Sequence, residues 1–171
     1  MDNQDAKKEN TTTLLVEEQF ESDEQKKVKE DISVLLIEDD EDDVRLTQRA
    51  FKKGKILNRL YVVHDGEEAM EFLRHQGQYT DPKLAPRPGI ILLDLNMPRM
   101  DGRDVLKRIK RDKNLMTIPV VVLTTSDQEN DVLDCYTNGA NSFITKPVEF
   151  NNFLNAVVTL GRYWLNITRL F

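Results

Sequence analysis

Short apolar runs alternate with amphipathic stretches from residue 32 onward. Each run is four or five residues long and largely apolar without interruption, which is typical of a strand buried on both faces. The predicted strands are 33–37, 59–63, 90–94, 120–124 and 142–145. Between them, apolar residues recur at the spacing of one helix face. The predicted helices are about 43–53, 66–76, 102–112 and 128–138, with a last one that begins near Glu149.

This alternation of strands and helices predicts a parallel sheet with helices on both faces. Five such units in residues 32–171 fit one flavodoxin-like, doubly wound α/β domain with strand order 2-1-3-4-5. The segment 77–89 carries three prolines, so we predict a long connecting loop there.

Residues 1–31 form a segment of different composition. They carry ten acidic and five basic residues, a single aromatic residue and neither Gly nor Pro. Such a segment buries too little apolar surface to offset the entropy that it would lose on ordering. We therefore expect an acidic, largely disordered N-terminal tail.

The overall composition excludes several classes of protein. A net charge of −6 is a poor match for nonspecific binding to nucleic acid or to an anionic membrane. No apolar run approaches the ~18 residues that a membrane span requires. Cys135 is the single cysteine, so we expect no internal disulfide and a reducing, cytoplasmic location. Two histidines are too few for most zinc sites.

Acidic residues are concentrated at one place in the predicted domain. All six residues from Glu38 to Asp43 are acidic, whereas the rest of 32–171 carries 14 acidic and 19 basic residues. Carboxylates this close repel one another unless a cation compensates their charge. The later members of the run also suit the N-terminus of the helix that follows, where negative charge is favourable.

Polar residues follow or end four of the predicted strands. In an open α/β sheet, ligands bind beyond the carboxyl ends of the strands, near the point where the strand order reverses. The residues that meet at this edge are Glu38, Asp39, Asp94, Thr124 and Lys146. Carboxylate ligands suit Mg²⁺, which binds few of them and retains several waters. The sequence therefore predicts a Mg²⁺ site with a position for an anion beside it.

Four motifs lie at these strand ends: LLIEDD, IILLDLNMPRMDG, VVVLTTS and ITKP. Together and in this order they resemble response-regulator receiver domains of two-component signalling, over about residues 32–171. Finer features are similar to the single-domain regulators that partner cyanobacterial phytochromes. These features include EDDEDDVRL, VHDGEEAMEFLR, DGRDVL and the ending WLNITRLF.

The resemblance implies that Asp94 accepts a phosphoryl group from a phosphohistidine of a sensor histidine kinase. It also implies the ligands of Mg²⁺: Asp39 and Asp94 directly, Asn96 through its backbone carbonyl, and Glu38 through a water. Glu38 stands where the family more commonly has Asp, one methylene shorter. Phosphoryl transfer to a carboxylate nucleophile needs this kind of charge compensation.

Further roles also follow from the resemblance. Lys146 would pair with a phosphoryl oxygen, and Thr124 would hydrogen-bond another. Phe143 would change rotamer as Thr124 moves, which would switch the face formed by the fourth helix, fifth strand and fifth helix. Asn96 and Ser126 lie where the family tunes hydrolysis of the acyl phosphate.

The last helix carries more apolar surface than one sheet face requires. From Phe150 to Leu170 its apolar residues cover about 240° of arc, against a usual stripe only somewhat wider than ~100°. We expect the surplus to form a two-fold homodimer contact. The residues assigned to this contact are Phe153, Leu160, Tyr163, Trp164 and Ile167. In the alternative, Trp164 and Phe171 fold back onto their own domain.

A phosphorylation-dependent switch, rather than an enzyme, is the function we expect from these residues. Only 25 residues follow Lys146, so we expect no output domain. A Mg²⁺-dependent phosphohydrolase is one alternative, but the haloacid-dehalogenase type requires a second Asp where Asn96 stands. A receiver-like scaffold that is not phosphorylated is the other, and the intact set Asp94, Asp39, Thr124 and Lys146 argues against it.

Overall fold

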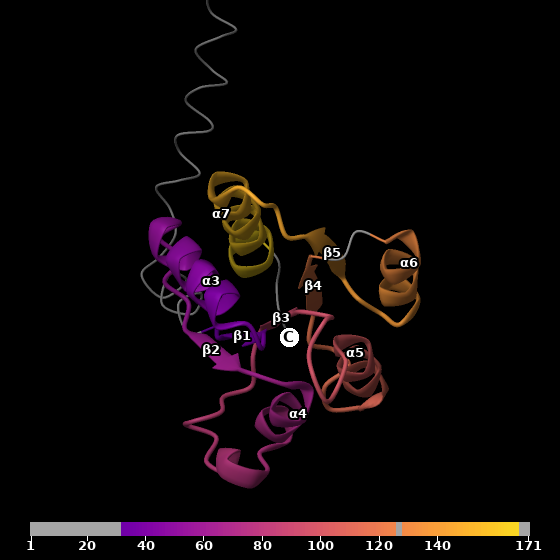
Figure 1. The fold of residues 1–171 in the computed structure, drawn as a ribbon. Coiled ribbons are helices and arrows are strands. Elements are labelled where there is room, and N and C mark those ends of the chain that lie inside the picture. Colours follow the sequence, from indigo (N-terminus) through magenta and orange to yellow (C-terminus); the bar gives the residue numbers. More distant parts are fainter. Residues whose placement is uncertain (1–31, 126–127, 168–171) are drawn as a thin grey trace, which may run out of the picture.

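The computed structural model describes residues 32–125 and 128–167. Its parallel strands form a sheet in the order β2-β1-β3-β4-β5, which confirms the predicted fold (Figure 1). The strands are β1 Val34–Ile37, β2 Leu60–Val63, β3 Ile90–Leu93, β4 Val120–Thr124 and β5 Ser142–Thr145. Every residue of β1, β3 and β4 is buried, as expected for central strands covered on both faces.

Helices cover both faces of this sheet (Figure 1). They are α3 Glu41–Lys53, α4 Gly66–Arg74, α5 Gly102–Arg111, α6 Glu129–Thr137 and α7 Phe150–Leu160. A π-helical segment, η2 Gly161–Ile167, continues α7, and a short 3₁₀ helix, η1 Gly77–Tyr79, lies in the connector after α4. Helices α3 and α7 lie on one face of the sheet, and α4, α5 and α6 lie on the other.

Alternate residues of each strand contribute to two separate cores. In β1, Val34 and Leu36 pack with α3 and α7, whereas Leu35 and Ile37 pack with α4 and α5. Successive side chains of a strand point to opposite faces of the sheet, so one short apolar run supplies both cores. The chain therefore needs uninterrupted apolar strands, and the residues that follow them are left at the sheet edge.

Two helix boundaries differ from the sequence prediction, and side-chain or backbone capping explains each. Helix α3 begins before residue 43 because the Asp40 carboxylate accepts hydrogen bonds from the backbone N–H groups of Asp42 (2.7 Å) and Asp43 (3.2 Å). Helix α4 ends at Arg74 because His75 adopts the left-handed conformation, with φ of 54°.

The predicted dimer surface is wrong for Phe153. This side chain is 1% exposed and belongs to the core beneath α3 and α7. Leu160 and Trp164 are partly buried and pack against the same core, in agreement with the alternative in which Trp164 folds back. Tyr163 is 54% exposed. The side chain of Ile167 lies outside the described part of the structure, as does Phe171.

The reason for this correction is that α7 packs against a helix as well as against the sheet. Two cations of α3 lie over the ring of Phe150, which belongs to α7. The Arg49 guanidinium carbon is 4.4 Å from the centroid of this ring, and the Lys53 ammonium nitrogen is 5.1 Å from it. A helix buried on two sides needs a wider apolar stripe than a helix on one sheet face. Part of the apolar surplus of α7 is therefore satisfied within the domain.

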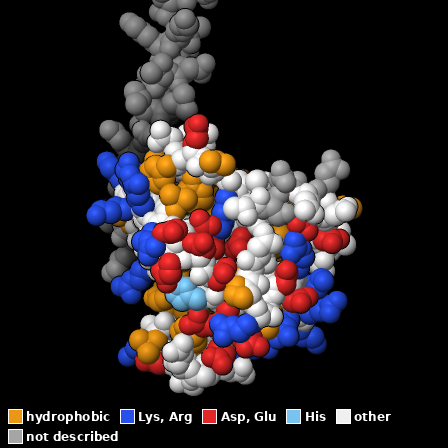
Figure 2. Space-filling model, in the orientation of Figure 1, with side chains coloured by type: hydrophobic (Ala, Val, Ile, Leu, Met, Phe, Trp, Pro, Cys, Tyr) orange, Lys and Arg blue, Asp and Glu red, His pale blue; other side chains and the backbone are white. Residues whose placement is uncertain are grey.

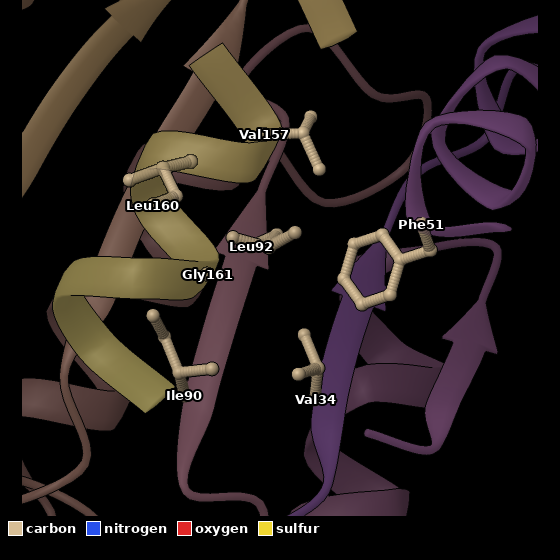
Figure 3. Close-up of a pocket in the computed structure, with 7 residues that line it drawn as sticks. All are labelled: Val34, Phe51, Ile90, Leu92, Val157, Leu160 and Gly161. Atoms are coloured by element: carbon tan, nitrogen blue, oxygen red, sulfur yellow. The ribbon is translucent and has the colours of Figure 1, made fainter. Parts of the chain in front are cut away.

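A small apolar crevice lies between α3 and α7, over β1 and β3 (Figure 3). Figure 3 shows the ring of Phe51 on the side of Val34 and β1, and the side chains of Val157 and Leu160 on α7, near Leu92 of β3. Its volume of about 10 Å³ is close to the minimum for a single water, and its lining offers no polar side chain. This crevice is a packing gap between two helices rather than a ligand site.

Three sequence predictions concern residues that the structure does not describe. These are the disorder of the tail, residues 1–31, the role of Ser126, and the fold of the last four residues, 168–171. Within 32–125 and 128–167, no helix combines the length and hydropathy needed to cross a membrane.

Candidate functional site

Three carboxylates meet at the edge where β1 and β3 end. The backbone N–H of Glu38 donates to the carbonyl of Val63 (3.0 Å), and that of Asp94 donates to the carbonyl of Ile37 (3.0 Å). These bonds extend the parallel strand ladders and place Glu38, Asp39 and Asp94 side by side. One carboxylate oxygen from each lies within 4.8 Å of the others. Acidic side chains gather in the middle of the face seen in Figure 2.

The donor set suits a hard divalent cation. Glu38 is 2% exposed and Asp94 is 5% exposed, whereas Asp39 is partly open to solvent. Buried carboxylates this close are unfavourable unless positive charge compensates them. Oxygen ligands with room for water on one side match the preference of Mg²⁺ and similar ions. Glu38, Asp39 and Asp94 are therefore the residues that could hold a metal.

Lys146 supplies positive charge to the same site from the end of β5. Its ammonium donates to Glu38 Oε2 at 2.6 Å and to Asp43 Oδ2 at 2.6 Å, and lies 3.6 Å from Asp94 Oδ1. The lysine is placed by its own backbone, because its N–H donates to the carbonyl of Thr124 (2.7 Å) on the adjacent strand. Only 7% of the Lys146 side chain is exposed.

Burial and the neighbouring charges shift the pKa values of this pair. Burial raises the pKa of Glu38 to about 7, although the hydrogen bond from Lys146 acts to lower it. Burial alone would lower the pKa of Lys146, but its hydrogen bonds to Asp43 and Glu38 outweigh that effect and raise it. Lys146 therefore stays an ammonium ion at neutral pH, available to an anion.

Thr124 and Asn96 border the site on the side of β4. The Asn96 backbone N–H donates to Asp94 Oδ2 (3.1 Å), and its side-chain Nδ2 lies 3.4 Å from the fully buried Thr124 Oγ1. The structure thus brings together the predicted set of Asp94, Thr124 and Lys146. Phe143 is half-buried on β5 and packs against the core beneath α4 and α5. Its role as a switch residue stays a prediction, and so does the Asn96 carbonyl as a ligand.

A close backbone approach explains the glycine of the MPRMDG motif. A Cβ added to Gly102 would lie 2.1 Å from the Asp94 carbonyl oxygen, which no side chain permits. Glycine therefore allows the first residue of α5 to lie against the backbone of Asp94. Asp101 caps that helix, because its carboxylate accepts a hydrogen bond from the Arg103 N–H (2.7 Å). In the same loop Arg99 has φ of 66° and pairs with the buried Asp65.

Sequence reasoning missed Asp43 as a site residue. The sequence predicts a metal pair at Glu38 and Asp39, followed by residues that suit a helix N-terminus, and Asp40 does cap α3. Asp43, however, turns from the first turn of α3 toward Lys146. No sequence signal separates it from its neighbours, because residues 38–43 are all acidic and the direction of each side chain depends on how α3 packs.

Comparisons with known proteins agree with this geometry. Residues 34–158 match the model of the response regulator receiver domain. The chain is 42% identical over 128 residues to the response regulator Rcp1 of Synechocystis sp., a match that spans 75% of this chain and 85% of that protein.

Two solved structures are also similar. The phosphorylated cyanobacterial phytochrome response regulator RcpA is 40% identical, with a TM-score of 0.76 over 82% of this chain and 98% of that one. The Mn²⁺-bound form of Rcp1 is 41% identical, with a TM-score of 0.75 over 82% and 99% of the respective chains.

Proposed function

The chain belongs to the response regulator receiver family, and on this premise we propose that it is a stand-alone response regulator that accepts a phosphoryl group on Asp94. One observation supports this proposal most directly. The Asp94 carboxylate is buried at the edge of the sheet, within 4.8 Å of two other carboxylates and 3.6 Å from the Lys146 ammonium. These surroundings provide the charged groups that phosphoryl transfer to a carboxylate requires.

The proposed donor is a phosphohistidine of a sensor histidine kinase. An Asp94 oxygen attacks phosphorus, the P–N bond to histidine breaks, and the histidine nitrogen leaves with the electron pair as the new P–O bond forms. Lys146 compensates the negative charge of the phosphoryl oxygens. Its ammonium lies beside Asp94 before the reaction, so little reorganisation is needed.

The proposed cofactor is Mg²⁺, held by Asp39, Asp94 and the Asn96 carbonyl, with Glu38 acting through a water. When bound, it neutralises charge on the transferred group. Support comes from the three clustered carboxylates, and from the similar protein Rcp1, which has a Mn²⁺-bound form. Removing divalent ions is therefore expected to abolish phosphorylation.

The proposed response to phosphorylation lies on the face formed by α6, β5 and α7. Thr124 Oγ1 accepts from Asn96 Nδ2 at 3.4 Å, and its hydroxyl would donate to a phosphoryl oxygen, with Phe143 following by a change of rotamer. The proposed partner kinase is a phytochrome, because the similar protein RcpA is a phytochrome response regulator. The exposed Tyr163 stays our proposed homodimer contact, together with the parts of Leu160 and Trp164 that are not packed against their own core, whereas Phe153 is excluded by its burial.

The test uses the full chain, Mg²⁺ and a small acyl-phosphate donor. Wild type is expected to gain the mass of one phosphoryl group, and Asp94→Asn is expected to gain none. The gain should disappear after treatment with base and in the presence of a chelator. No gain in wild type would instead favour an unphosphorylated scaffold, and turnover of added phosphoesters would favour a phosphohydrolase.

A further inference from the structure

Lys146 contacts Asp43, a residue to which the sequence motifs assign no role in the site. Asp43 belongs to the first turn of α3, and its Oδ2 accepts from the Lys146 ammonium at 2.6 Å. On the other side of the same ammonium, Glu38 Oε2 accepts at 2.6 Å. Both hydrogen bonds are short and come from a charged donor, which makes them stronger than hydrogen bonds between neutral groups.

These two hydrogen bonds determine where the third donor of the ammonium is available. A lysine ammonium has three N–H donors. Two of them are taken by Glu38 and Asp43, whereas Asp94 Oδ1, at 3.6 Å, is beyond hydrogen-bond distance. The ammonium is therefore ion-paired with Asp94 but not hydrogen-bonded to it. The Asp94 oxygen keeps its lone pairs for attack on phosphorus, and a positive charge lies next to it.

We propose that Asp43 is a positioning residue for phosphorylation, and the proposal rests on the proposed function of Asp94. Lysine has a flexible four-carbon side chain, so an ammonium held by Glu38 alone would move. If it moved toward Asp94, it would hydrogen-bond the attacking oxygen and weaken it as a nucleophile. Away from Asp94 it would leave the phosphoryl oxygens uncompensated. Loss of Asp43 slows phosphorylation in either case.

The acidic run provides a matched control in the neighbouring residue. Asp42 lies in the same turn of α3, but its side chain is 89% exposed and pairs with Arg45 at 2.6 Å. Asp42→Asn and Asp43→Asn therefore remove the same charge from the same helix N-terminus, and only the second removes a partner of Lys146. The contacts that Asp43 makes within α3 use its backbone: its N–H donates to Asp40, and its carbonyl accepts from Thr47. Substitution of its side chain leaves these contacts in place.

The experiment measures the rate of phosphorylation of the full chain with an acyl-phosphate donor and Mg²⁺. Asp43→Asn is expected to be slower than wild type by about 10-fold, well within the loss that a misplaced reacting group causes. Asp42→Asn is expected to stay within about twofold of wild type, since its charge is exposed and screened. Asp43→Glu restores a carboxylate and is expected to recover most of the rate.

A double substitution tests whether Asp43 acts through Lys146. Once Lys146→Ala has removed the ammonium, adding Asp43→Asn is expected to change the rate less than twofold, because the two residues act as a unit. Circular dichroism of each variant checks that it is folded.

Three results would overturn the proposal while leaving the proposed function intact. The first is an equal phosphorylation rate for Asp42→Asn and Asp43→Asn, and the second is a phosphorylation rate of Asp43→Asn above that of wild type. The third is that Asp43→Asn slows phosphorylation as much in the Lys146→Ala variant as it does in wild type. A wild type that takes no phosphoryl group would refute the proposed function, and this inference with it.

Discussion

Strand β3 and the residue that follows it are buried to a similar degree but differ in chemistry. Leu93 is fully buried within an apolar core, and its neighbour Asp94 is 5% exposed among charged groups. Burial of Leu93 stabilises the fold by removing apolar surface from water. Burial of Asp94 removes a carboxylate from water and places it near two others, which is unfavourable for folding. The core holds the site in place, and the site reduces the stability that the core provides.

Removal of the buried Phe153 ring tests how much the core contributes to stability. Phe153→Ala is expected to lower the free energy of unfolding by about 3–5 kcal/mol, because it empties a fully buried position beneath α3 and α7. Tyr163→Ala, a change of similar size on the exposed side of the same helical segment, is expected to cost considerably less, because the Tyr163 side chain is 54% exposed. Urea denaturation measures both. Equal losses would contradict the assignment of Phe153 to the core and Tyr163 to the surface.

Gly102 joins the two regions, since its backbone touches the carbonyl of Asp94. Gly102→Ala is expected to lower the free energy of unfolding by about 1–3 kcal/mol, the usual cost of forcing an extra carbon into a packed site. Unlike Phe153→Ala, it is also expected to slow phosphorylation, because the strand end carrying Asp94 must move. Urea denaturation and the phosphorylation rate test it together. An unchanged rate in a destabilised variant would show that the loop is not coupled to the site.

Most of the fold could be predicted from the sequence, and the reason is physical. Strands buried on both faces require uninterrupted apolar runs, and helices on those faces require a period near 3.6, so both kinds of element are visible in one dimension. The carboxyl ends of parallel strands share an edge, so Glu38, Asp94 and Lys146 could be placed together before any coordinates.

Two features of the structure depend on contacts that no periodicity encodes. Phe153 is buried because α7 packs against α3 as well as against the sheet, and the sequence does not contain the distance between those helices. Asp43 reaches Lys146 because the first turn of α3 faces the end of β5. In the sequence, Asp43 cannot be distinguished from Asp42, which is exposed.

Removal of the Asp94 charge tests how much the clustered carboxylates reduce stability. Without divalent ions, Asp94→Asn is expected to raise the free energy of unfolding by about 1 kcal/mol, since it removes one of three repelling carboxylates. Mg²⁺ at about 100 times its dissociation constant should stabilise wild type by about 2.7 kcal/mol and stabilise the variant less. Urea titrations with and without Mg²⁺ measure both. An Asp94→Asn protein that is less stable than wild type without Mg²⁺ would mean that Asp94 serves the fold.

Among the clustered carboxylates, we propose that Asp94 receives the phosphoryl group. Borohydride reduction of the phosphorylated full chain converts an aspartyl phosphate into homoserine, which peptide mass spectrometry then locates. Homoserine is expected at position 94 alone, and only when Mg²⁺ and the acyl-phosphate donor were both present. A reduced residue at Glu38, Asp39 or Asp43 with Asp94 unchanged would contradict it.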